Sequence, residues 1–137
     1  MEDTLIINKI IQCGDKISMD SNYHIDWDKT ISLNAGNAEL ALDILQMFAD
    51  ELPQSRQKIE YYWKNMELEN LSRIIHKLRG SCCYCSAARL GELAAEIEIA
   101  IVDNNETPSA QTVEACLTEI SAIIHELETR TFATTTS

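Results

Sequence analysis

Residues 73–85, RIIHKLRGSCCYC, have the spacing of an amphipathic helix with a histidine on the side opposite its apolar stripe. At about 100° per residue, one group of residues falls between about 100° and 180° from His76 around such a helix: Leu71, Ile74, Ile75, Leu78, Cys82 and Cys85. These residues form the stripe that a helix buries. The pattern therefore predicts a long helix with His76 exposed near its middle.

The surroundings of His76 are small or basic. Ser72, Gly80 and Cys83 fall within about 40° of it, and Arg73 and Arg79 fall about 60° to either side. Glycine within a helix costs about 1 kcal/mol relative to alanine. Gly80 removes the side chain that would stand over the ring one turn away, so we expect a notch in which a partner can approach one ring nitrogen.

A neutral, exposed imidazole is a good nucleophile near pH 7. Arg79 and Lys77 are placed to neutralise a dianionic group, which favours a phosphoryl group over an acyl group. The alternative is that His76 is an ordinary surface histidine of a helical scaffold that contacts a partner without chemistry.

Composition and charge narrow the class of protein. The chain has 137 residues, 45% of them apolar, with only 4 glycines and 2 prolines, as expected for one globular helical domain. Its net charge of −11 argues against nucleic acid or an anionic membrane as partners. Residues 73–89 nevertheless hold four basic residues and no acid, and this basic island suggests a local anion site.

The five cysteines raise a second hypothesis: Cys13, Cys82, Cys83, Cys85 and Cys116. Their odd number and clustering argue against a disulfide framework and favour a reducing compartment. Cys82 and Cys85 form a C-x-x-C motif, but redox motifs of this kind normally follow a strand. A zinc site would need Cys116 or His125 nearby, so small core residues are the favoured interpretation.

Apolar periodicity and breaker residues divide the chain into helices. We predict helices over residues 26–34, 37–64, 67–85, 87–102 and from 108 or 109 to about 128. Asn37 is expected to cap the long helix, and Pro53 to kink it or split it near Leu52. Residues 1–25 are expected to be a linker or docking segment, and residues 131–137 a disordered tail. The fold class is all-α: an antiparallel four-helix bundle with a short extra N-terminal helix.

Several of these segments resemble the histidine phosphotransfer (HPt) family. Residues 76–81, HKLRGS, match its signature of His, any residue, an aliphatic, Lys or Arg, Gly, then Ser or Ala. Further similarities lie in Ile25-Asp26-Trp27, in Gly36-Asn37, in the long helix with Phe48, Glu51, Leu52 and Pro53, and in Arg89, Leu90, Leu93, Ile97 and Glu98. The resemblance covers residues 25 to about 127. The stretch HKLRGSCCYC with the preceding long helix most resembles the C-terminal HPt module of BarA/GacS-type hybrid sensor histidine kinases.

This resemblance implies specific roles. His76 would be the phosphoacceptor, Arg79 would take a position usually held by lysine, and Gly80 would keep the approach open. Glu98 would hold Nδ1–H of the ring and leave Nε2 as the nucleophile; an ordinary solvated glutamate is the alternative. The departures from the family pattern are the cysteine-rich segment 82–85 and the pair Ala87-Ala88.

The resemblance also implies partners and location. The phosphoryl donor and acceptor would be receiver domains, of a hybrid kinase and of a response regulator. Mg²⁺ would belong to the receiver, and this chain would bind no cofactor and no ATP. A cytoplasmic monomer is expected, either free-standing or as part of a membrane-bound kinase. The docking face would include Ser72, Arg73 and Cys83; Leu40, Ile44 and Met47 would join it if exposed, although we favour core positions for them.

Overall fold

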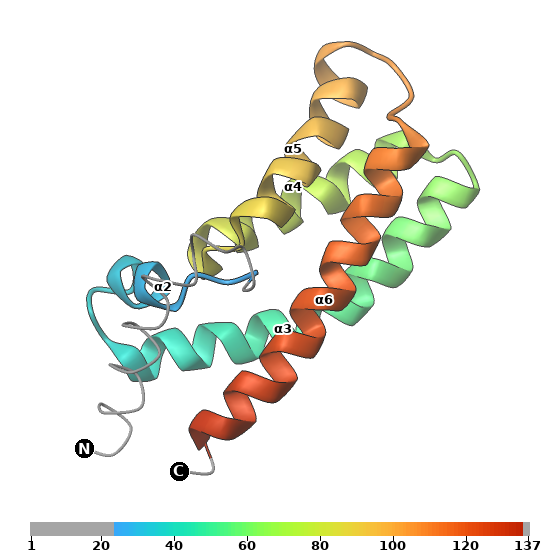
Figure 1. The fold of residues 1–137 in the computed structure, drawn as a ribbon. Helices are drawn as coiled ribbons and strands as arrows, with labels where there is room; N and C mark the ends of the chain where they lie inside the picture. The colour runs from blue at the N-terminus through green and yellow to red at the C-terminus, as the bar shows by residue number, and fades with distance from the viewer. Residues whose placement is uncertain (1–23, 136–137) are drawn as a thin grey trace.

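The computed structural model describes residues 24–135, with side chains for residues 24–129. Within this range the chain forms five α-helices and one π-helical turn (Figure 1): α2 (Trp27–Leu33), α3 (Ala38–Lys64), α4 (Leu68–Cys85), α5 (Ala88–Glu98), η1 (Ile99–Asp103) and α6 (Ala110–Thr135). α4 packs between α3 and α5, and α6 closes the bundle against the same two helices. The predicted all-α antiparallel bundle with a short preceding helix is confirmed.

Local signals explain where these helices begin and end. The side chains of Asp26 and Asn37 accept hydrogen bonds from backbone N–H groups in the first turns of α2 and α3. α4 ends at Ser86, whose φ of 56° places it in the left-handed region, and its N–H bonds the carbonyl of Cys82. The chain then turns at once into α5, so α4 and α5 are antiparallel neighbours.

Pro53 lies inside α3 without dividing it. Proline lacks the N–H that would bond the carbonyl four residues earlier, and its ring crowds that carbonyl. The helix continues and changes direction in its middle, as Figure 1 shows. The predicted kink is therefore present, whereas the alternative of a split near Leu52 is wrong.

The later helices depart from the predicted boundaries. The segment predicted as one helix over 87–102 is α-helical only to Glu98 and then widens into η1. There the N–H of Asn104 bonds the carbonyl of Ile99 over 3.0 Å, an i→i+5 bond. α6 continues to Thr135 rather than ending near residue 128, because residues 129–135 contain no glycine or proline to stop it. Residues 131–135 thus continue α6 where a disordered tail over 131–137 was predicted, and 136–137 lie outside the described residues.

The segment before α2 belongs to the bundle from His24 onward. The buried carboxylate of Glu126 on α6 accepts the N–H groups of His24 and Ile25, at 2.9 and 3.0 Å. His24 Nδ1 lies 2.6 Å from Oε2 of Glu119, which is also buried. His24 and Ile25 therefore contact the bundle, although the predicted linker or docking segment extended to residue 25. Residues 1–23 of that segment lie outside the described range.

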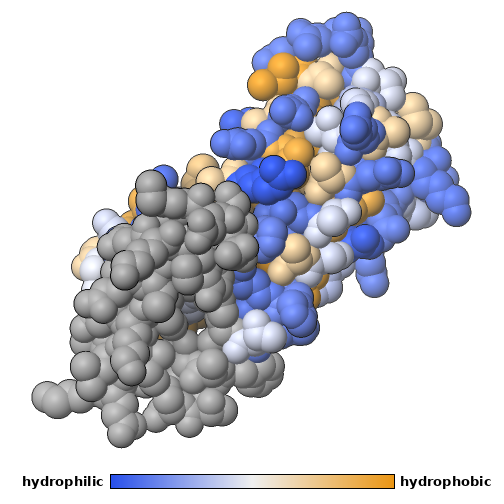
Figure 2. All heavy atoms as spheres, viewed as in Figure 1, coloured by the Kyte–Doolittle hydropathy of each residue, from blue (hydrophilic) through white to orange (hydrophobic). Residues whose placement is uncertain are grey.

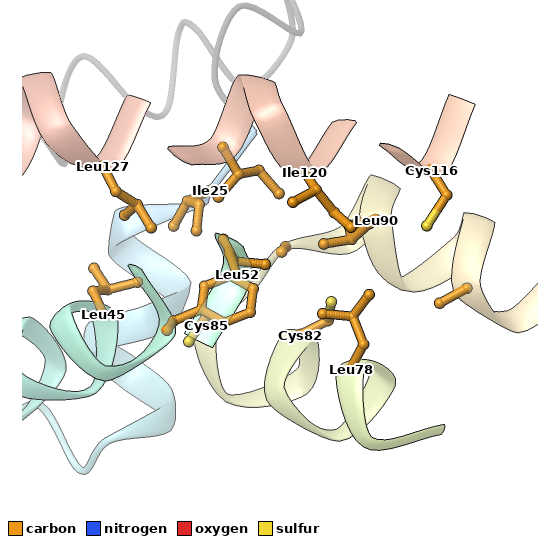
Figure 3. Packing of buried hydrophobic residues seen from close by; sticks show 14 of the residues in the cluster. Ile25, Leu45, Leu52, Leu78, Cys82, Cys85, Leu90, Cys116, Ile120 and Leu127 are labelled. Atoms are coloured by element: carbon orange, nitrogen blue, oxygen red, sulfur yellow. The ribbon is translucent and has the colours of Figure 1, made fainter. Parts of the chain in front are cut away.

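The core runs the length of the bundle and includes every main helix. Figure 3 shows Ile25 pointing toward Ile120 and Leu127 of α6, with Leu52 of α3 beneath it. The stripe predicted on α4 is buried except for Ile74, which is half-buried against the core. On α3, Leu40 and Met47 are 44% and 70% exposed, so the core positions favoured for them are wrong; Ile44 is half-buried. None of the helices in the described range is long and apolar enough to cross a membrane.

The fully buried Leu78 gives a test of this packing. Leu78→Ala should lower the free energy of unfolding by about 2–5 kcal/mol, because it removes buried apolar area and leaves a cavity. Urea denaturation followed by circular dichroism measures this change. Met47→Ala is the matched control and should stay within about 0.5 kcal/mol of wild type. Equal losses for the two variants would contradict the described packing of α3 and α4.

Candidate functional site

His76 stands on the outer face of α4, near the middle of the helix. Its side chain is 76% exposed, while Ile75 and Leu78 on the opposite face are fully buried. The buried stripe fixes the orientation of α4, and α4 therefore holds the imidazole toward solvent, as predicted. A Cβ added at Gly80 would meet nothing within 4 Å, so the space one turn beyond the ring is open.

Glu98, the last residue of α5, brings a carboxylate to this ring. His76 Nδ1 and Glu98 Oε2 are 2.6 Å apart, across 22 residues of sequence. An ionised carboxylate only accepts hydrogen bonds, so the ring in this contact carries a proton on Nδ1. In the neutral imidazole the lone pair is then on Nε2, on the other side of the ring.

Arg79 binds the second oxygen of the same carboxylate: its Nη1 donates to Oε1 of Glu98. The Glu98 side chain is only 14% exposed, whereas that of Arg79 is 43% exposed. One carboxylate therefore joins the histidine to its basic neighbour. The expectation that Glu98 lies beside the ring agrees with this geometry; the solvated-glutamate alternative does not.

The remaining sequence candidates are spread around this centre. Arg73 donates to Glu69 over 2.9 Å, one turn back along α4, and so does not contact Glu98. Lys77 is exposed and its side chain makes no ion pair with any described residue. Cys83 is exposed and Ser72 is half-buried, with its hydroxyl donating to the carbonyl of Glu69.

The Hpt domain family matches residues 43–130, more than half of the chain. The chain belongs to the Hpt domain family. Hpt domains are phosphocarriers that perform histidine phosphotransfer in phosphorelays and interact with receiver domains. The family inferred from HKLRGS is thereby confirmed.

Individual relatives are proteins much longer than this chain. The signal transduction histidine-protein kinases BarA of Shigella flexneri and Escherichia coli K12 are each 39% identical over 83 residues, 61% of this chain and 9% of the kinase. Sensor protein GacS of Pseudomonas syringae is 29% identical over 104 residues, 76% of this chain and 11% of that protein. This Hpt domain thus spans about a tenth of the length of these curated relatives.

A solved structure has the same fold. The HPT domain of a sensor hybrid histidine kinase from Shewanella superposes with a TM-score of 0.72 at 27% identity. The match covers 77% of this chain and 92% of that one. The helical bundle of this chain therefore has the same fold as an experimentally determined Hpt domain.

The Glu98 carboxyl of this Hpt domain responds to its two partners. Its partial burial raises the pKa, but hydrogen bonds from Arg79 and His76, together with their positive charges, outweigh this and leave the pKa below its usual value. Glu98 is therefore held ionised as an acceptor for both neighbours.

Cys82 and Cys85 take core positions, as favoured. Cys82, Cys85 and Cys116 are buried free thiols, and only Cys83 of the four described is exposed. Burial raises the pKa of Cys85 and of Cys116 to about 12, and that of Cys82 is raised as well. Among residues 24–135, no three His, Cys, Asp or Glu side chains are grouped so as to hold a metal ion. Cys13 lies outside the described residues.

Sequence reasoning missed two features of charge. It assigned Arg79 to neutralise a phosphoryl group and did not pair it with Glu98. It also missed a second histidine–carboxylate pair, in which Glu119 contacts His24 and lies 3.5 Å from Arg89. The available signal was weak: Glu119 follows the buried Cys116 by three residues, which places it beside the apolar stripe of α6.

The lowered pKa of Glu98 predicts a pH-dependent contribution to stability. A carboxyl group whose pKa is lower in the folded state than in the unfolded state stabilises the folded protein at pH values above its unfolded-state pKa. It loses that effect as the pH falls through its folded-state pKa. The difference in unfolding free energy between wild type and Glu98→Gln should therefore be present at pH 7 and shrink as pH falls below 4.5. Urea denaturation across pH measures it. Glu96→Gln, at an exposed position of α5, is the control, and an equal pH dependence for both variants would contradict the assignment.

Thiol reactivity tests the placement of the cysteines. A soluble alkylating reagent should modify Cys83 in the folded protein much faster than Cys82, Cys85 or Cys116, because only the thiolate of an accessible cysteine reacts. Peptide mapping by mass spectrometry assigns the sites, and unfolding in urea should equalise the rates. Rapid modification of Cys82 and Cys85 in the native protein would overturn their core assignment.

Proposed function

We propose that His76 is the phosphoacceptor of this Hpt domain and that its Nε2 is the nucleophile. The observation that carries the proposal is the 2.6 Å contact between His76 Nδ1 and Glu98 on a ring that is 76% exposed. The carboxylate occupies one nitrogen and fixes the ring, and the other nitrogen remains accessible to a partner.

The proposed step is a reversible in-line transfer. The lone pair of Nε2 attacks the phosphorus of an aspartyl phosphate on a receiver domain, an N–P bond forms, and the O–P bond breaks. The aspartate leaves as a free carboxylate, and the Nδ1 proton remains in its hydrogen bond with Glu98. The phosphohistidine then gives the group to the aspartate of a response regulator by the reverse chemistry. Such transfer depends mainly on positioning and charge neutralisation.

The proposed docking face surrounds His76 and extends to the start of α3. It comprises Ser72, Arg73, Lys77 and Cys83 of α4 with the exposed Leu40 and Met47 and the half-buried Ile44. Exposed apolar side chains beside basic ones suit a partner whose reactive group is an acidic side chain. Gly80 supports this proposal, because nothing within the domain fills the space that a side chain there would occupy.

The cofactor and the cellular setting are part of the proposal. The Mg²⁺ that assists transfer belongs to the receiver, and the domain takes its phosphoryl group from a receiver and not from ATP. Its similarity to segments of BarA and GacS supports a place within a hybrid sensor kinase. The domain would then act in the cytoplasm and as a monomer, because the face around His76 must remain open to partners.

Phosphotransfer from a radiolabelled receiver domain, with Mg²⁺, tests the role of His76. Wild type should acquire an acid-labile, alkali-stable label, and His76→Gln should acquire none, because the amide cannot form a phosphohistidine. His24→Gln is the matched control, since His24 Nδ1 contacts Glu119 over the same 2.6 Å as His76 contacts Glu98. His24→Gln should be labelled like wild type.

Two other outcomes would change the interpretation. Binding of a receiver without label on wild type would favour the alternative in which the domain is a helical scaffold. Label that persists in His76→Gln but disappears in His24→Gln would move the phosphoacceptor to His24. Incubation with ATP and Mg²⁺ alone should label neither protein, and a label under those conditions would refute the dependence on a receiver.

A further inference from the structure

We propose that Arg79 exchanges partners when His76 is phosphorylated: it binds Glu98 in the unphosphorylated domain and the phosphoryl group afterwards. This inference rests on the proposed function, because it concerns the charge balance of the same site. It assigns Glu98 a second role, as the resting partner of the residue that neutralises the phosphoryl group.

The geometry gives Arg79 access to both partners. Arg79 follows His76 by three residues and so lies on the neighbouring part of the same helix face, one turn away. Its guanidinium binds Oε1 of Glu98 while His76 binds Oε2, so all three groups meet at one carboxylate. Arg79 is the more exposed member of the ion pair, at 43% against 14% for Glu98. The carboxylate is therefore packed in place, and the long side chain is free to turn toward solvent.

Charge provides the driving force for the exchange. Before transfer, the opposite charges of Arg79 and Glu98 offset each other beside the imidazole. Transfer leaves a phosphoryl group of about two negative charges on Nε2, on the opposite side of the same imidazole from Glu98. Because Nδ1 keeps its proton, the ring takes up one positive charge, and the net change at the site is about −1. A guanidinium binds phosphate oxygens through two parallel hydrogen bonds, and this favours its transfer to the more highly charged group.

The other nearby cations are less suited to this role. Arg73 is paired with Glu69 one turn back along α4. Lys77 is adjacent to His76 in sequence and so projects about 100° around the helix from it. Residues 90–129 contain no lysine or arginine, so this part of the chain supplies no further cation of that kind. Among the basic residues of α4, Arg79 is therefore the one that binds Glu98 beside His76.

Resonances of the arginine side chains test the exchange directly. In ¹⁵N-labelled protein, the Nε–H signal of Arg79 should shift when the domain is phosphorylated by a receiver. It should also shift in unphosphorylated Glu98→Gln, where the carboxylate partner is lost. The signal of Arg89, which lies 3.5 Å from Glu119, is the internal control and should remain in place in both experiments.

The equilibrium distribution of label between receiver and Hpt domain supplies a functional measurement. Arg79→Gln should lower the share of label on His76 about three- to tenfold, the range for an exposed charge-assisted contact. Arg79→Lys should restore part of it, and Arg89→Gln should match wild type. Glu98→Gln should raise the share, because the amide still accepts from Nδ1–H but no longer competes for Arg79.

The outcomes distinguish a failure of this inference from a failure of the proposed function. If wild type takes no label on His76, the proposed function fails first. If wild type is labelled but the Arg79 signal does not move on phosphorylation, Arg79 is a permanent support for Glu98 and the exchange is overturned. A share of label unchanged by Arg79→Gln, or lowered by Glu98→Gln, would also overturn it.

Discussion

The site of this Hpt domain depends on how closely α4 and α5 approach each other. Small residues meet where the two helices pack: a Cβ built on Gly91 would lie 3.5 Å from the Cβ of Cys82. From that contact, His76 lies six residues back along α4 and Glu98 seven residues forward along α5. Because the helices are antiparallel, both steps lead in the same direction, and the carboxylate arrives beside the ring. A larger side chain at either contact position would separate the helices and weaken that pairing.

The two ends of this helix pair are fixed differently. At one end, the left-handed Ser86 closes α4, and the start of α2 holds the turn. The N–H of Asp26, the N-cap of α2, donates to the carbonyl of Ser86, and the hydroxyl of Thr30 within α2 donates to the carbonyl of Cys85. At the other end, α5 passes into η1 directly after Glu98, and Ile99 and Val102 of this turn are exposed. In Figure 2, apolar atoms gather at this upper end of the molecule. Glu98 is thus the last side chain that the regular part of α5 positions.

Periodicity was sufficient to predict the helices and the outward direction of His76, because both follow from an apolar stripe of one helix. Glu98 was nominated by the family resemblance and not by periodicity, since a contact across 22 residues depends on register and not on local pattern. The exposed Leu40 and Met47 were assigned to the core because their spacing fits a helix face equally well. The π-helical turn and the link between Arg79 and Glu98 follow from tertiary packing, for which a single sequence has no local signal.

Gly80 destabilises its own helix, and this cost to stability points to a binding partner. In the interior of a helix it sacrifices about 1 kcal/mol relative to alanine. A side chain there would touch nothing in the described domain, so packing within the chain does not require glycine. The left-handed region does not require it either, because the positions of positive φ lie elsewhere in the described residues. What remains is the open space beside an imidazole that is held by its far nitrogen. That space has a physical use only if another molecule enters it, and under the proposed function the group that enters is the aspartyl phosphate of a receiver.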